Sequence, residues 1–175
     1  MNQPGILLTM GEYCIRRVQA GDVDALVRYA NNRSVSINLR DIFPYPYERR
    51  HAEAWLRDVR KMSPETAFAI ATAEELIGGI ALHPQSDVHR RSAELGYWLA
   101  EPYWGRGIAT RAVQAMTEWG FGHLDINRIY AHVFGWNPAS ARVLEKAGYV
   151  LEGRLRQAVT KDGQVTDLLV YGMVR

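Results

Sequence analysis

The chain contains 175 residues, 47% of them hydrophobic, and carries a formal net charge of +2 at pH 7. This length and composition fit one domain with a single packed core over residues 1–175. The low net charge and interspersed charge signs argue against nucleic-acid binding, and no apolar run approaches the roughly 20 residues of a membrane span. Cys14 is the sole cysteine, which excludes an internal disulfide. With no signal peptide evident, we expect a cytoplasmic protein.

Hydrophobic periodicity and proline or glycine punctuation divide the first half of the chain into strands and helices. The expected elements, in chain order, are a loosely held segment at 1–10, a strand at 13–18, a helix capped by Asp22, a helix at 47–62, and a hairpin of strands at 68–72 and 77–82. Two prolines, Pro44 and Pro46, separate the two helices.

The second half continues with the same two kinds of element. We expect a central strand at 93–99, a helix from Gly107 to about Gly122, a strand at 129–134, a helix beginning at Asn137, and two strands at 149–159 and 165–173 joined by a turn at Asp162-Gly163. This order predicts a mixed α/β fold around one central sheet.

The stretch Glu94–Thr110 combines a buried strand, the motif Gly105-Arg106-Gly107 and an immediate helix start. The first turn of a helix offers unpaired N–H groups and the positive end of the dipole, and glycines let a phosphate approach closely. The segment therefore predicts a pyrophosphate site, although a tight strand-to-helix turn without ligand explains the glycines equally well. The motif lacks the Lys-Ser/Thr pair of an ATP-binding loop, and Thr110 stands where a dinucleotide fold needs its third glycine.

A second motif, at residues 137–149, contains residues typical of both the start and the end of a helix, and it follows a strand-like run at 128–134. Asn137 suits the N-cap, Pro138 the first helical position and Gly148 the C-terminal stop.

Together, the two motifs resemble those of the GNAT superfamily of acetyl-CoA-dependent N-acetyltransferases. The likeness covers essentially the whole chain and is closest to the RimJ/RimL branch, the ribosomal-protein alanine N-acetyltransferases, with further matches at 38–47 and 151–167. It implies the GNAT fold, in which a central, mostly antiparallel sheet has splayed parallel strands and flanking helices. It also implies acetyl-CoA as cosubstrate and direct attack by a primary amine, with a protein N-terminal α-amino group as the expected acceptor, and it allows a homodimer.

By this resemblance, main-chain N–H groups at the helix start hold the coenzyme A pyrophosphate; they belong to Gly105, Arg106, Gly107, Ala109 and Thr110. The main chain near Tyr97 and Leu99 is expected to pair with the pantetheine arm as an added strand does. Trp104 replaces a Gln or Arg of the superfamily, and we expect it to pack rather than bind. Asn137 belongs to the same cofactor-binding set, but a pure capping role is an equal alternative.

Two residues are the candidates for proton transfer. Ser140 matches a serine of the RimJ/RimL branch whose hydroxyl could donate to the departing sulfur, because Leu144 occupies the place of the tyrosine that many superfamily members use. The alternative is a serine that bonds the local backbone. Glu94, on the strand expected beside the thioester, is the candidate base, acting directly or through water. Its alternative role is a structural charge partner for an arginine.

No metal site is expected, because the five histidines do not form a ligand spacing with Cys14 or nearby acids. The acceptor is expected between the loop at 36–47 and the hairpin at 154–166. Two other functions stay open: acetylation of a small molecule, such as a polyamine, amino sugar or antibiotic, and a non-catalytic sensor that binds acyl-CoA.

Overall fold

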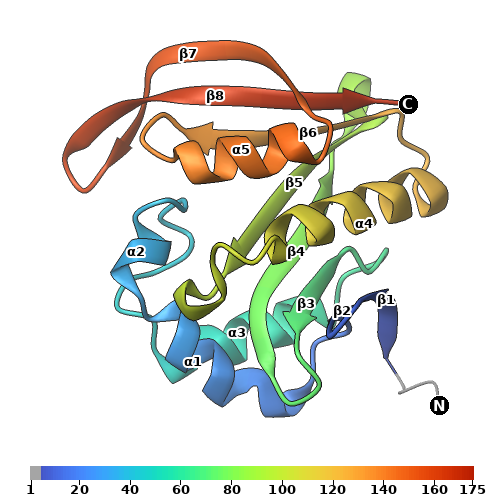
Figure 1. Cartoon of the computed structure of the whole chain (residues 1–175), viewed down its shortest axis with the longest axis vertical. Helices are drawn as coiled ribbons and strands as arrows, with labels where there is room; N and C mark the ends of the chain where they lie inside the picture. The colour runs from blue at the N-terminus through green and yellow to red at the C-terminus, as the bar shows by residue number, and fades with distance from the viewer. Residues whose placement is uncertain (1–4) are drawn as a thin grey trace. The chain divides into compact units, whose positions relative to one another are not determined.

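The computed structural model describes residues 5–175, which form eight strands, five α-helices and three short 3-10 helices (Figure 1). The strands are β1 (Ile6–Met10), β2 (Tyr13–Arg16), β3 (Ala67–Ala71), β4 (Leu76–Pro84), β5 (Ser92–Leu99), β6 (Arg128–Phe134), β7 (Val150–Lys161) and β8 (Gln164–Val174). The α-helices are α1 (Val23–Ala30), α2 (Arg33–Ser36), α3 (Arg49–Val59), α4 (Ile108–His123) and α5 (Pro138–Lys146), and the 3-10 helices are η1 (Ala20–Asp22), η2 (Asp87–His89) and η3 (Glu101–Tyr103).

The strands form one sheet in the order β1-β2-β3-β4-β5-β6-β8-β7. Strands β5 and β6 are parallel, whereas β1/β2, β2/β3, β3/β4, β6/β8 and β7/β8 are antiparallel. The predicted mixed α/β architecture is therefore confirmed. Among residues 5–175, no helix is both long and apolar enough to cross a membrane.

The chain divides into two compact units. The first contains the described chain up to Ala81 together with Tyr97–Ala112, and the second contains Leu82–Gly96 and Val113–Arg175.

The core of the first unit packs α1 and α3 against its strands. The buried side chains of α1, Ala25, Leu26 and Ala30, recur at helical spacing, as do Ala52, Leu56 and Val59 of α3. Apolar residues three to four positions apart share one helix face, so each helix buries one side and leaves the other in solvent. Both helices were predicted, although α3 is shorter than the expected range 47–62.

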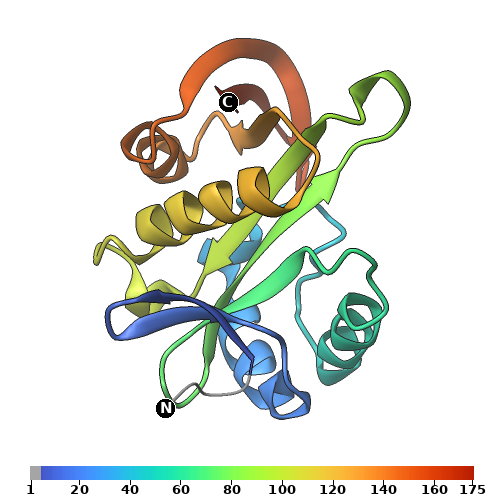
Figure 2. The same ribbon diagram turned by 90° about the vertical axis from the view of Figure 1, so that its right-hand side faces the viewer.

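Two features of the first unit differ from the sequence predictions. Of the segment expected to be loosely held, residues 1–4 lie outside the described residues, whereas Ile6–Met10 form strand β1, which makes a hairpin with β2 (Figure 2). Asp22 precedes α1 as predicted, but its side chain makes no capping bond to that helix. Its carboxylate instead accepts hydrogen bonds of 2.9 and 2.7 Å from the guanidinium of Arg16, which is 8% exposed. An unpaired buried guanidinium costs more free energy than a missing helix cap, so the Asp22 carboxylate pairs with Arg16.

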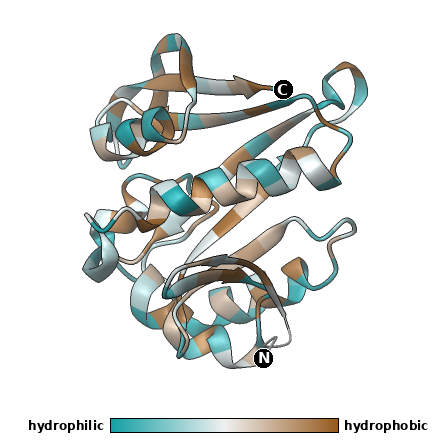
Figure 3. Ribbon diagram, turned by 45° about the vertical axis from the view of Figure 1, so that its right-hand side comes forward, coloured by the Kyte–Doolittle hydropathy of each residue, from teal (hydrophilic) through white to brown (hydrophobic). Residues whose placement is uncertain are grey.

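The second unit packs helices on one face of β6 and β8. Helix α4 alternates hydrophobic and hydrophilic residues along its length (Figure 3), and its Gly120 lies so close to the sheet that an added Cβ would stand 2.4 Å from Leu82 Cδ1. The Thr117 and Tyr149 hydroxyls are 2.7 Å apart in this core. The predicted turn at Asp162-Gly163 is present, with positive φ at both residues, 50° and 76°. Two consecutive positive φ angles match the twist of a tight β-hairpin.

Candidate functional site

The start of α4, in the first unit, has the geometry of an anion-binding helix terminus. Gly105 and Gly107 have φ of 76° and 72°, and the helix begins at Ile108. The N–H of Arg111 donates to the carbonyl of Gly107 at 3.1 Å, so this is where the helical bonding begins. The preceding N–H groups, up to that of Thr110, have no place in the helical ladder and lie at the positive end of the dipole.

The two glycines leave room for a ligand. A Cβ built on Gly105 or on Gly107 would meet nothing within 4 Å. Their positive φ already favours glycine over residues with a side chain, so the local conformation accounts for the motif. The open space beside this turn also fits a phosphate group, which needs close approach to main-chain N–H groups.

Two side chains of the same loop fold back on it. The guanidinium of Arg106 donates to the Pro102 carbonyl at 2.9 Å and lies 5.4 Å from the centre of the Tyr103 ring. Trp104, expected to pack, is 44% exposed and donates its indole N–H to the Leu99 carbonyl at 2.8 Å. Because a carbonyl has two lone pairs, Leu99 can accept one further hydrogen bond.

The start of α5, in the second unit, matches the sequence prediction closely. The side-chain oxygen of Asn137 accepts a hydrogen bond of 3.1 Å from the N–H of Ser140, and Gly148 ends the helix with φ of 97°. The capping role of Asn137 is therefore confirmed. Ser140 lies in the first helical turn, and one turn later Leu144 is fully buried.

Asn137→Ala is expected to lower the free energy of unfolding by about 1 kcal/mol, the usual value of an N-cap. Chemical denaturation without cofactor measures it, with Asn127→Ala as the control because Asn127 is exposed and precedes a strand. Equal stability of the two variants would show that the cap contributes little.

Glu94 and His132 form a pair on β5 and β6. The parallel register places Glu94 opposite Tyr130, so His132, two residues further along, points to the same face of the sheet. Its Nδ1 is 3.2 Å from Glu94 Oε1, and the two side chains are 34% and 15% exposed. Glu94 was predicted as a charge partner for an arginine or as a base. A histidine partner was not predicted, because nothing in the sequence sets a register between residues 94 and 132.

Other groups with acid–base chemistry are held in structural roles. Burial raises the pKa of Tyr149 to about 12. Burial, and then the hydrogen bond that it donates to Glu145, raise the pKa of Tyr171. Burial also raises the pKa of the Cys14 thiol, so this residue stays protonated at neutral pH and is a poor nucleophile. Within residues 5–175, no three His, Cys, Asp or Glu residues are grouped as a metal site.

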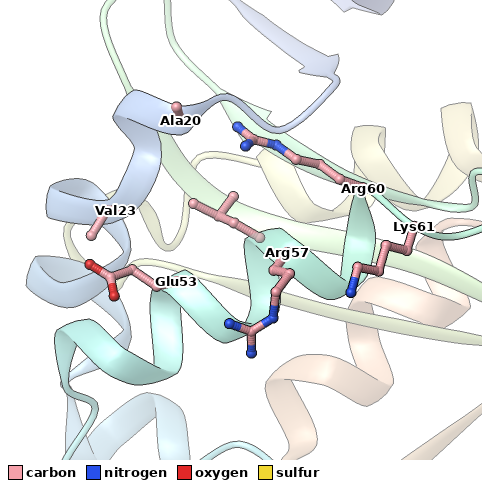
Figure 4. Close-up of a pocket in the computed structure, with 7 residues that line it drawn as sticks. Ala20, Val23, Glu53, Arg57, Arg60 and Lys61 are labelled. Carbon is pink, nitrogen blue, oxygen red and sulfur yellow. The ribbon is translucent and has the colours of Figure 1, made fainter.

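A hollow of about 430 Å³ lies against α3, away from these residues in the sequence (Figure 4). It is lined by Ala20, Val23, Glu53, Leu56, Arg57, Arg60 and Lys61. None of the predicted site residues lines it.

Relatives that share sequence with this chain include acetyltransferases of different named substrates. It is 40% identical over 102 residues to the uncharacterized N-acetyltransferase YoaA of Bacillus subtilis (strain 168), which covers 58% of this chain and 57% of that protein. It is 32% identical over 107 residues to the ribosomal-protein-serine acetyltransferase of Escherichia coli (strain K12), covering 61% and 59%. It is 27% identical over 157 residues to the spermidine N(1)-acetyltransferase of Vibrio cholerae serotype O1, covering 88% of each. The first two alignments thus span less than two thirds of those relatives.

A family model and a solved structure complete the comparison. The structure of RimL, a ribosomal L7/L12 α-N-protein acetyltransferase in complex with coenzyme A, superposes with a TM-score of 0.85 at 22% identity, covering 97% of both chains, which shows a shared fold. Residues 13–150 match the acetyltransferase (GNAT) domain model. Since that match covers most of the sequence, the chain belongs to the GNAT family of acetyltransferases.

Proposed function

We propose that this chain transfers an acetyl group from acetyl-CoA to a primary amine, and that the acceptor is the α-amino group of a protein N-terminus. The observation that carries the proposal is the start of α4, where positive-φ glycines and unpaired helical N–H groups leave open space suited to a pyrophosphate. The superfamily to which the chain belongs supplies the chemical context.

The cofactor would be held by main chain more than by side chains. The N–H groups from Gly105 to Thr110, with those of Arg106, Gly107 and Ala109 between them, would bind the pyrophosphate. The main chain of Tyr97 and Leu99 would bind the pantetheine arm, Leu99 through the acceptor capacity that its bond to Trp104 leaves. Asn137 would contribute indirectly, by fixing the first turn of α5 around Ser140. Acetyl-CoA itself supplies the activated acetyl group.

Two side chains would move protons. Glu94 would accept the proton that the attacking amine must lose, directly or through water. Ser140 would donate its hydroxyl hydrogen bond to the sulfur as negative charge develops there. The high pKa of the Cys14 thiol argues for direct attack by the amine rather than an acetyl-cysteine intermediate.

The small number of proposed proton-transfer groups favours an α-amino acceptor. An α-amino group has a pKa of about 8, whereas an alkyl ammonium lies near 10, so a single carboxylate suffices for the former. The relative that acetylates a ribosomal-protein serine supports this class of acceptor. A small polyamine is the second candidate, because the spermidine acetyltransferase aligns over 88% of the chain.

The decisive experiment offers both classes of acceptor with acetyl-CoA. Peptides with N-terminal alanine or serine, the same peptides with a blocked N-terminus, and spermidine are compared by thiol release and intact mass. A gain of one acetyl on the free peptides alone supports the proposal. Acetylation of spermidine alone would replace it with the second candidate, and no transfer to any amine would contradict both.

Ser140→Ala is expected to lower turnover about 100-fold, the low end for loss of a general acid, because water can partly replace the hydroxyl. Acetyl-CoA affinity should change little, since the proposed cofactor contacts are main-chain groups. Ser34→Ala is a suitable control because Ser34 is exposed and its own N–H, not its hydroxyl, makes the local cap bond. A folded Ser140→Ala enzyme with parental turnover would remove Ser140 from the mechanism.

A further inference from the structure

We infer that His132 is a positioning residue for Glu94, and that its protonation switches the carboxylate between a base and a neutralised ion pair. The inference rests on the proposed function, in which Glu94 accepts the proton of the amine. It concerns a residue of this chain that neither the sequence pattern nor the family match assigns.

The contact itself defines the tautomer. His132 Nδ1 lies 3.2 Å from Glu94 Oε1. An ionised carboxylate only accepts hydrogen bonds, so Nδ1 must carry the proton. In the neutral histidine this leaves Nε2 as an acceptor, and the Nδ1–H bond fixes one oxygen of Glu94.

The neighbours of the pair on the same face of the sheet come from β4, β6 and β8. On the same face of β6, the Tyr130 ring centre is 5.3 Å from that of His132, and Arg128 pairs with Glu152 of β7. Strand β8 places the neutral Val170 opposite His132. From β4, the His83 ring lies 3.7 Å from the position of a Cβ on Gly96, the next β5 residue of the face that carries Glu94, so His83 is a further titratable group on this face.

Protonation changes what the pair can do. Imidazole is the side chain that gains a proton in the neutral pH range. A neutral His132 orients an ionised Glu94 without compensating its charge, so the carboxylate can accept a proton. An imidazolium stabilises the carboxylate as an ion pair and repels an incoming ammonium, so both effects oppose the reaction at low pH. The pair would therefore add one ionisation to the acid side of the rate profile.

The first test needs no acceptor and no turnover. Nitrogen-15 spectra of the histidine rings at pH 8 should show His132 as the Nδ1–H tautomer in the parent and lose that signature in Glu94→Ala. His123 is the internal control, because its Nδ1 contacts the Trp119 carbonyl at 2.8 Å and should keep the same tautomer in both proteins. A His132 spectrum unchanged by Glu94→Ala would overturn the pairing, whatever the enzyme acetylates.

The second test separates positioning from a structural role. At pH 8, His132→Leu, which removes the donor, should lower kcat/KM about tenfold through misplacement of the carboxylate. His132→Gln retains a donor and should recover most of that loss. From pH 9 down to 5.5, log kcat/KM of the parent should fall with a slope approaching two, and that of His132→Gln with a slope near one.

The control is His89→Gln, the same change in the exposed 3-10 helix η2, which should keep the parental profile. If His132→Gln also keeps it, or if His132→Leu is as active as the parent, the positioning role is wrong while the proposed function stands. If the parent acetylates no amine, the proposed function fails, and the tautomer measurement still decides the pairing.

Discussion

Gly107→Asp is expected to abolish the stabilisation that acetyl-CoA gives the parent protein. At about 100 times the dissociation constant, a ligand that binds only the folded state adds roughly 2.7 kcal/mol to the free energy of unfolding. An aspartate at position 107 would place a carboxylate in the open space beside the first turn of α4. There it would occupy the phosphate position and repel a pyrophosphate. Thermal denaturation with and without millimolar acetyl-CoA measures the effect.

A matched control distinguishes loss of binding from backbone strain. Gly163 has φ of 76°, close to the 72° of Gly107, and an added Cβ there also meets nothing within 4 Å. Gly163→Asp therefore carries the same conformational cost in the turn between β7 and β8, and it should keep the full response to acetyl-CoA. A parent protein whose melting is unchanged by acetyl-CoA would contradict the cofactor proposal. A Gly107→Asp variant that keeps the full response would exclude this turn as the pyrophosphate site.

Glu94→Gln is expected to slow turnover at pH 7 by about 100-fold or more, since general-base catalysis is typically worth 10²–10⁴-fold. The deficit should shrink as pH rises, because a growing fraction of the amine arrives without its proton. At neutral pH the acceptor is largely an ammonium, and the parent enzyme alone has a carboxylate to remove that proton. Turnover from pH 7.5 to 9.5, with one acceptor peptide and saturating acetyl-CoA, measures the trend above the pH range in which an imidazolium would also disable the parent's carboxylate.

Acetyl-CoA binding by this variant should be unchanged, because the proposed cofactor contacts do not involve Glu94. Glu118→Gln is the control for a lost carboxylate, since Glu118 is exposed on α4 and has no proposed role. A deficit of Glu94→Gln that stays constant across the pH range would identify Glu94 as a structural or substrate-holding residue. It would also remove the basis of the His132 proposal.

Most of the secondary structure could be predicted because its signals are local. Asn137 caps α5 through an N–H three residues away, and Gly148 ends that helix through its own φ. The sign of φ at Gly105, Gly107 and Gly163 depends only on the residue and its immediate turn. The motifs built from these positions, and with them the family, were therefore readable before any tertiary contact was known.

The candidate site and its surroundings were only partly predictable, because several side-chain contacts depend on the folded conformation and have no local sequence signal. The half-exposed Trp104 donates a hydrogen bond to the Leu99 carbonyl, five residues earlier. No sequence motif predicts this bond. The capture of Asp22 by Arg16 overrode a local capping preference, because the folded chain buries the guanidinium. Local propensity was outweighed there by the cost of an uncompensated buried charge.

Sequence alone thus determined the start of α4 after Gly105 and Gly107 and the start of α5 after Asn137. It also determined the turn at Asp162-Gly163 and membership of the GNAT family. Only the tertiary structure decided that β1 joins the sheet and that Glu94 meets His132, 38 positions away. The physical reason is that the register between β5 and β6, which are not joined by a tight turn, has no local determinant. A shift of one residue in the β5–β6 register would turn His132 to the opposite face, and it is the burial of Ile129 and Ala131 against the second unit's core that prevents it.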